Sequence, residues 1–395
     1  AGQMSWQNKD KRPVWVLAVA QALFQTCSVL MATLSGLVGL HLASDKGMAT
    51  LPIAVMVLAA AAMMIPASML MQRLGRRQGF LMGAALGVAA GLLAAAGLHW
   101  HRFDWFVGAH ALFGAYQGFA QYYRFAAADL APAEFKSKAI SWVMMGGVVA
   151  AIAGPNLARL TQDLGPEPFT ASYLALGVLS VLAGMLLMRL SLPAVPVDAV
   201  TGTGRPLWQI MRQPVFVAAL AGSSVGFSVM IMVMTATPLA MQVCGHPLGA
   251  SATVIQWHVL GMFVPSFFTG SLIKRWGVLT VMSAGLVAFA GHIAIALFGT
   301  AFWNFVSGLI LLGIGWNFLF IGGTTLVASA YQPAERAKTQ AAHDFLMFGL
   351  ASAASFSAGT LMHWLGWQAV NLTALPFLVL AWAAMAWLKF NKPAV

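Results

Sequence analysis

Long apolar stretches, separated by short polar ones, run along the whole chain. A helix needs about 20 apolar residues to cross roughly 30 Å of hydrocarbon, at about 1.5 Å per residue. Twelve stretches are long enough, and we expect each to form a transmembrane helix. They cover residues 14–40, 48–71, 78–98, 104–128, 139–160, 170–190, 214–240, 250–273, 278–298, 302–328, 339–362 and 367–388.

A polar segment rich in Pro, Gly and Thr divides the twelve predicted spans six and six. It covers residues 191–213 and leaves no room for a soluble domain. The pattern therefore predicts an N-terminal six-helix bundle over residues 1–190, a cytoplasmic linker over 191–213 and a C-terminal six-helix bundle over 214–395. The first apolar stretch is long enough to span, so we expect a retained helix and not a cleaved signal peptide.

Composition supports a membrane protein and excludes an ordinary soluble one. Of the 395 residues 60% are hydrophobic and 8% are charged, whereas a soluble domain carries about 25% charged residues. A chain this apolar has too little polar surface to face water, so the lipid bilayer is its expected partner and solvent. The two cysteines are too few for a disulfide framework.

The Lys and Arg residues lie almost entirely on one side of the predicted membrane. With the N-terminus inside, 17 of the 21 fall on the cytoplasmic side, three (Lys46, Arg102 and Arg159) fall outside, and Arg124 lies within a span. Positive charge marks the cytoplasmic side, so we expect both termini in the cytoplasm and the protein in a bacterial inner membrane. The net charge of +11 follows from this asymmetry, and we expect no nucleic-acid partner.

Two short motifs recur in the second half of the chain at almost the same offset. Gln72-Arg73-Leu74-Gly75 is followed 202 residues later by Lys274-Arg275-Trp276-Gly277, and Pro132-Ala133-Glu134 is followed 201 residues later by Pro333-Ala334-Glu335. Two matches at one offset indicate a duplicated six-span unit. Repeated halves with a central binding site are typical of secondary transporters, so we expect a carrier.

The first of these motifs carries a family resemblance. The loop Arg73-Leu74-Gly75-Arg76-Arg77 resembles the cytoplasmic motif of the major facilitator superfamily, with Ser68 at the position of its leading Gly and Gln72 at the position of its Asp. The resemblance covers the whole chain. It implies an all-α membrane protein with 12 transmembrane helices in two pseudo-symmetric six-helix bundles, and a gating role for Arg73, Arg76 and Arg77.

Two predicted neighbouring spans carry soft metal ligands at matched depth. Met230 and Met234 lie one turn apart in span 7, and His258 and Met262 have the same spacing in span 8. Both pairs fall roughly 9–18 Å below the outer surface. Thioethers with an imidazole suit monovalent copper, whereas zinc prefers more His, Cys or carboxylate. Methionine is also an ordinary filler of apolar helices, so packing is the alternative interpretation.

These paired motifs resemble those of bacterial copper importers of the CcoA type within the same superfamily. The resemblance implies that the four residues bind copper, as Cu(I), and that the protein imports a copper ion or small copper chelate by alternating access for haem–copper oxidase assembly. Copper is then the transported substrate, with no prosthetic group. Further candidates for the metal pathway are Met241, Cys244, His246, Cys27 and Met63.

Ionisable residues inside predicted spans are candidates for gating or proton coupling, because charge in hydrocarbon is costly. They are Arg124 and Asp129 near the inner end of span 4, and His343 and Asp344 near the start of span 11. Span 4 also carries the most polar face of the first half, with Gln117, Gln121, Tyr122 and Tyr123.

Two other functions remain open, and we expect a monomer in each case. One is a major-facilitator carrier of an organic solute such as riboflavin, in which the methionines are packing and the polar face of span 4 binds the solute. The other is a membrane scaffold or sensor that binds metal without transporting it. An enzyme is not expected, because no nucleophile–base pair or metal–carboxylate site is visible.

Two measurements on the purified, reconstituted protein separate these functions. A copper importer is expected to retain copper under reducing conditions and to lose it in His258→Ala. Competition of uptake by excess riboflavin, with no metal recovered, is expected for the carrier of an organic solute.

Overall fold

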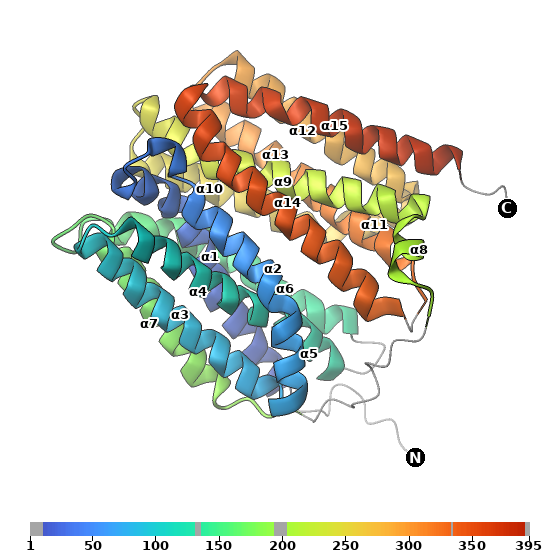
Figure 1. The fold of residues 1–395 in the computed structure, drawn as a ribbon, viewed down its shortest axis with the longest axis horizontal. Coiled ribbons are helices and arrows are strands. Elements are labelled where there is room, and N and C mark those ends of the chain that lie inside the picture. Colours follow the sequence, from blue (N-terminus) through green and yellow to red (C-terminus); the bar gives the residue numbers. More distant parts are fainter. Residues whose placement is uncertain (1–10, 131–135, 193–203, 333–334, 392–395) are drawn as a thin grey trace. The chain divides into compact units, whose positions relative to one another are not determined.

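Helices form the regular structure of the described residues, because lipid offers no partner for a backbone amide and each helix satisfies its own. The computed structural model describes residues 11–130, 136–192, 204–332 and 335–391. The elements in chain order (Figure 1) are α1 (Arg12–Leu42), the short 3₁₀ turn η2 (Lys46–Met48), α2 (Leu51–Leu74), α3 (Arg76–His99), α4 (Phe103–Ala120), α5 (Tyr123–Leu130), α6 (Lys136–Thr161), α7 (Thr170–Leu187), α8 (Leu207–Met211), α9 (Pro214–Val243), α10 (Leu248–Phe263), α11 (Ser266–Trp276), α12 (Val278–Phe298), α13 (Phe302–Ala328), α14 (Arg336–Trp364) and α15 (Trp367–Phe390).

The twelve predicted spans all correspond to helices, but two of them are interrupted. Within the described ranges, ten helices are long and apolar enough to cross a membrane. The predicted spans 104–128 and 250–273 are instead the pairs α4/α5 and α10/α11. In α10/α11 the cause is Pro265, which lacks the amide needed to continue the helical hydrogen-bond pattern.

The repeated loop motif has the same backbone conformation in both halves. Gly75 directly precedes α3 with φ 90°, and Gly277 directly precedes α12 with φ 88°. Residues with a Cβ rarely adopt this left-handed region of backbone conformation, so glycine is needed at both sharp turns. The repeat Pro-Ala-Glu is described only at Glu335, since residues 132–134 and 333–334 lie outside the described ranges.

The chain folds as two compact units. Unit 1 contains Ala1–Leu34 and Leu58–Val197, and unit 2 contains Ser35–Val57 and Asp198–Val395. The end of α1, η2 and the start of α2 thus belong with the C-terminal helices. The predicted bundle boundaries at residues 190 and 214 stay a prediction.

In unit 1, α3 packs along both α4 and α7, and α5 packs against α6. In unit 2, α9, α10 and α12 all pack along α13, and α9 also packs on α14 and α15. The hairpin around η2 is held to α14 by side chains. Thr50 donates its hydroxyl to Phe356 O at 3.0 Å, and Ser352 donates to Ala54 O at 2.6 Å.

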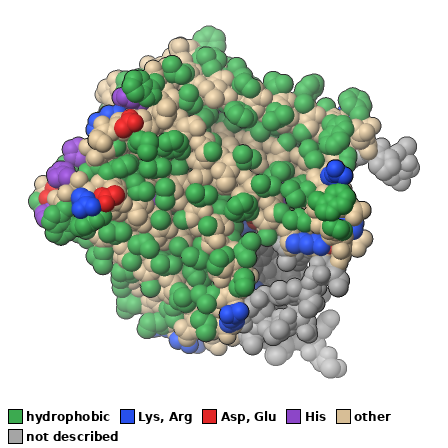
Figure 2. All heavy atoms as spheres, viewed as in Figure 1, with side chains coloured by type: hydrophobic (Ala, Val, Ile, Leu, Met, Phe, Trp, Pro, Cys, Tyr) green, Lys and Arg blue, Asp and Glu red, His purple; other side chains and the backbone are tan. Residues whose placement is uncertain are grey.

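The exposed surface along the sides of the helices, away from the loops at their ends, is apolar. Hydrophobic side chains dominate the face in Figure 2, where charged ones are few. Val178, Leu380 and Phe298 are 59, 58 and 88% exposed. Large exposed apolar areas are rare on soluble proteins, so these side chains face the lipid.

A buried ion pair anchors the end of the linker to the turn before α14. Glu335 accepts hydrogen bonds from the Arg205 backbone amide at 2.7 Å, from its Nε at 3.0 Å and from its Nη2 at 2.8 Å. The Glu335 side chain is fully buried, whereas that of Arg205 is one-third exposed. Bonding to the guanidinium and to the Gln332 amide lowers the pKa of Glu335 to about 2.

We predict that Glu335→Gln lowers the thermal stability of the purified protein at pH 7. A carboxylate with a depressed pKa stabilises the fold fully above its unfolded pKa, and this contribution is lost as the pH falls through the folded value. The difference in melting temperature from wild type should therefore be largest at neutral pH and shrink between about pH 4.5 and 2. Asp104→Asn, in the exposed pair with Arg102, should change little at any pH. An equal Glu335→Gln effect at pH 3 and pH 7 would contradict this account.

Candidate functional site

The four predicted metal ligands are buried in unit 2. Met230 and Met234 lie on α9 with 2 and 7% exposure, and Met262 lies on α10 with 8%. His258 is fully buried on α10, and its Nδ1 donates to the backbone carbonyl of Leu309 on α13 at 2.8 Å. One nitrogen of the imidazole is therefore already used by a neighbouring helix.

Helix packing does not favour a shared site for these two pairs. Helices α9 and α10 are consecutive, but α10 packs mainly along α13 and touches α9 little. Gly313 on α13 allows this close approach, since a Cβ there would lie 2.5 Å from His258 O. Among the described residues, no three His, Cys, Asp or Glu side chains form a group that could hold a metal ion.

The remaining pathway candidates are scattered. Met241 is buried and accepts a hydrogen bond from Ser251, whereas Cys244 is exposed. His246 Nε2 donates to Thr300 O at 2.9 Å. In unit 1, Cys27 is buried with its thiol 3.7 Å from Leu176 O, and a Cβ on Gly118 would lie 2.7 Å from Met63 Cβ, so Met63 packs against α4.

The gating candidates fall into two groups. Arg73 and Arg77 are exposed around the turn at Gly75, and Arg76 is partly exposed. His343 is buried, and its Nδ1 lies 3.0 Å from the Asp344 carboxylate, which is 43% exposed. Arg124 is partly buried on α5. Asp129 belongs to the same helix, but its side chain lies outside the described residues.

Unit 2 contains an aromatic cluster that the sequence patterns did not reveal. We define it as Phe227 on α9, Phe263 on α10, Trp316 and Phe320 on α13, and Phe348 on α14. The Trp316 ring stacks on Phe320 with centroids 4.9 Å apart, and it meets Phe227 and Phe263 edge-on at 6.4 and 6.0 Å. Phe227 in turn lies 5.0 Å from Phe348.

A polar stripe follows α9 beside Phe227. Ser224, Ser228 and Thr235 are spaced by four and seven residues, so they share one face of the helix. Their hydroxyl oxygens and the Trp316 indole nitrogen are buried and have no hydrogen-bond partner among the described residues. Buried polar groups are normally paired, so the helix that carries Phe227 of the aromatic cluster also carries unpaired polar groups that a solute could bond. The spacing of the stripe was the signal available in the sequence.

Asn317, next to Trp316, holds the interrupted span 8 in place. Its amide donates to Met262 O at 2.7 Å and to Ser266 Oγ at 2.8 Å, and its carbonyl accepts from Thr269 at 2.6 Å. These bonds bridge the break between α10 and α11 to α13. Because Phe263 lies at the same break, Asn317 also fixes the part of α10 that contributes to the aromatic cluster.

Unit 1 contributes a separate polar face. Gln21 and Gln25 are hydrogen-bonded to each other on α1 at 3.4 Å, and Gln117 and Gln121 are partly buried on and just after α4. Tyr122 donates its hydroxyl to Met64 O at 2.8 Å. The predicted polar residue Tyr123 instead lies in the core, with its ring 4.8 Å from that of Phe80.

The sequence profile of the Major Facilitator Superfamily matches residues 14–257 and 229–395. The chain belongs to the major facilitator superfamily. Its function is accordingly transport and not catalysis, as the absence of a nucleophile–base pair in the sequence had indicated.

The chain is also similar to individual transporters. The chain is 44% identical over 373 residues to the riboflavin transporter RfnT of Brucella anthropi, covering 94% of each chain. It is 30% identical over 361 residues to the uncharacterized MFS-type transporter YdeG of Bacillus subtilis, covering 85% of this chain and 82% of the relative.

Solved structures support the fold. The nucleoside transporter NupG superposes with a TM-score of 0.70 at 18% identity, covering 95% of this chain and 99% of that one. The Escherichia coli fucose:proton symporter FucP superposes with a TM-score of 0.62 at 15% identity, covering 97 and 99%. The predicted all-α membrane fold of the superfamily is confirmed.

The predicted copper import is wrong. A relative 44% identical over almost the whole chain is a riboflavin transporter, which favours the organic-solute alternative over copper import and over a CcoA-type importer. The physical reason for the error is that His-x-x-x-Met and Met-x-x-x-Met spacings describe each helix alone, whereas in the structure α10 packs chiefly on α13 and touches α9 little. Metal binding by these four side chains stays a prediction, and without copper import such a site would have no function.

We predict that Asn317→Leu destabilises unit 2, because it removes the side-chain partners of Met262 O and Thr269. The expected loss is about 1–2 kcal/mol, measured as a lower melting temperature in detergent. Asn391→Leu, at the exposed end of α15, is the matched control and should change stability little. Equal melting temperatures for Asn317→Leu and wild type would show that the hydrogen bonds of Asn317 do not hold α10 and α11 at the break.

Proposed function

We propose that the protein carries riboflavin, or a closely similar flavin, across the bacterial inner membrane by alternating access. The likeness that supports this is the 44% identity to a riboflavin transporter along 94% of both chains. Orientation with both termini in the cytoplasm, as the distribution of Lys and Arg predicts, is part of the proposal.

The aromatic cluster of unit 2 is the proposed site for the flavin ring. The isoalloxazine ring is flat, with apolar faces and with carbonyl oxygens and an N–H along one edge. Aromatic rings prefer offset-stacked or edge-to-face partners, and the rings around Trp316 already adopt both arrangements. Phe227, Phe263 and Phe320 are each partly exposed, so ring surface remains for a solute.

The polar groups beside the cluster match the rest of the solute. The Trp316 indole N–H can donate to a ring carbonyl, and the hydroxyls of Ser224 and Ser228 can both donate and accept. Riboflavin also carries a flexible chain of hydroxyl groups that needs such partners. A few polar groups set in an apolar and aromatic wall are the usual composition of a small-molecule site.

Gating by the loop Arg73–Arg77 and a coupling role for Arg124, Asp129, His343 and Asp344 remain proposals for the same carrier. His343 Nδ1 lies 3.0 Å from the Asp344 carboxylate on α14. Measuring uptake with and without a proton gradient would separate coupled from uncoupled transport.

The test of the solute site is uptake of radiolabelled riboflavin by proteoliposomes. We expect Trp316→Ala to raise the half-saturating concentration roughly tenfold, because a lost aromatic stacking contact costs about 1–3 kcal/mol. Ser228→Ala should raise it by a smaller factor, about two- to fivefold, since one hydrogen bond is removed.

Trp303→Ala is the matched control, because Trp303 lies on the same helix but is 73% exposed. It should transport riboflavin as the wild type does. Wild-type kinetics in Trp316→Ala, with correct folding of both variants, would place the flavin elsewhere. No uptake by the wild type above protein-free liposomes would overturn the proposed function itself.

A further inference from the structure

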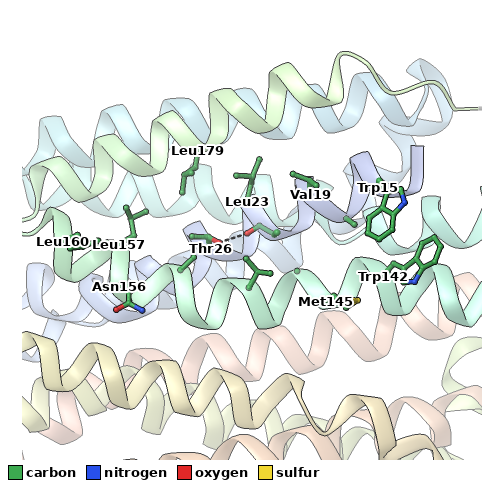
Figure 3. Close-up of a pocket in the computed structure, with 15 residues that line it drawn as sticks. Trp15, Val19, Leu23, Thr26, Trp142, Met145, Asn156, Leu157, Leu160 and Leu179 are labelled. Carbon is green, nitrogen blue, oxygen red and sulfur yellow. Dashed lines mark hydrogen bonds between the residues drawn. The ribbon is translucent and has the colours of Figure 1, made fainter. Parts of the chain in front are cut away.

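A long groove opens on the exposed side of unit 1, away from the residues discussed above. It has a volume of about 720 Å³ and lies between α6 and α7, with α1 as its floor (Figure 3). Helices α6 and α7 touch only briefly, while α1 packs closely on both: a Cβ on Gly146 would lie 2.8 Å from Ala22 N, and the Cys27 thiol reaches Leu176 O.

The lining of the groove is almost wholly hydrocarbon. None of its fifteen described lining residues is charged. Its two polar side chains bond to their own helices: Thr26 donates to Ala22 O and Asn156 donates to Ile152 O, both at 2.7 Å. Small residues such as Ala18 and Ala153 give the groove its depth. A flavin would lose its hydrogen bonds here, whereas an acyl chain would lose none.

One end of the groove has the features of a membrane–water interface. Trp15 and Trp142 stack there with centroids 4.9 Å apart and planes 12° apart. Lys11 lies over the Trp142 ring at 5.8 Å, and Arg12 begins α1 beside it. Tryptophan collects at the headgroup level, and paired cations there attract anionic lipid.

The dimensions agree with this placement. Eleven residues separate Trp15 from Thr26 along the floor, which is about 17 Å at 1.5 Å per residue. One leaflet contributes about half of the roughly 30 Å hydrocarbon thickness. An acyl chain that starts at the tryptophan pair therefore fills the groove along the length of its α1 floor.

We propose that this groove binds one anionic phospholipid, with an acyl chain along α1 and its phosphate at Lys11 and Arg12. The occupant is a lipid of the surrounding leaflet, held by apolar contact along the groove and by charge at its mouth. The proposal does not depend on which solute the protein carries.

Native mass spectrometry of the delipidated protein tests this with two added lipids that have the same acyl chains, phosphatidylglycerol and phosphatidylcholine. The wild type should retain one phosphatidylglycerol in preference to phosphatidylcholine. The double variant Lys11→Gln/Arg12→Gln should lose that preference, by about fivefold in affinity for each cation. Ala153→Phe, which fills the groove, should reduce retention of both lipids.

Matched controls change the same properties elsewhere. Lys274→Gln/Arg275→Gln removes two exposed cations from unit 2, and Val178→Phe enlarges an exposed side chain of α7 outside the groove. Both should bind lipid as the wild type does, and the melting temperature of each variant shows whether it is folded.

Three results would overturn the proposal. The first is equal retention of the two lipids by the wild type, which would mean that apolar contact alone holds the lipid. The second is wild-type retention by folded Ala153→Phe. The third is a protein dimer that Ala153→Phe dissociates, which means that a second copy of the chain occupies the groove.

Discussion

The structure depends on one constraint: inside hydrocarbon, each backbone polar group must find its partner within the protein. Continuous helices meet it without help, and ten of the described helices are long and apolar enough to span in this way. At the interruption between α10 and α11, a side chain from another helix bonds the backbone. Asn317 does this for Met262 O at the break caused by Pro265. At the break between α4 and α5 the direction is reversed, because Tyr122 at the break donates to Met64 O of the continuous helix α2. The break at Pro265 also places Phe263 in the aromatic cluster, so the proposed site depends on how a missing hydrogen bond is replaced.

Features encoded locally were predictable from the sequence. The spans follow from stretch length, and the matching turns at Gly75 and Gly277 follow from the repeat and have nearly equal positive φ. The breaks were harder to predict, because Pro66 and Pro155 lie inside continuous helices, whereas Pro265 ends one. Whether a proline bends or breaks a span depends on side chains such as Asn317, which lies 52 residues away in the sequence.

The candidate site was the less predictable part for the same reason. Equal depth along two consecutive spans does not establish contact: α10 packs mainly on α13, whereas α9 packs on α14, α13 and α15 and touches α10 little. The aromatic cluster combines four helices, so no local spacing reveals it, although the stripe Ser224, Ser228 and Thr235 was visible in the sequence. The pairing of polar groups also distinguishes the aromatic cluster from the groove on α1. Beside the cluster, hydroxyls and an indole N–H have no partner among the described residues, so they suit a polar aromatic solute. In the groove the polar groups are already bonded, so the groove suits an acyl chain.

The central claim is that this chain transports a flavin, and reconstitution tests it most directly. Purified protein in liposomes should take up radiolabelled riboflavin in a saturable manner, with uptake abolished by excess unlabelled riboflavin and unaffected by copper. Uptake no greater than that of protein-free liposomes, or saturable uptake of copper with no effect of riboflavin, would contradict the account.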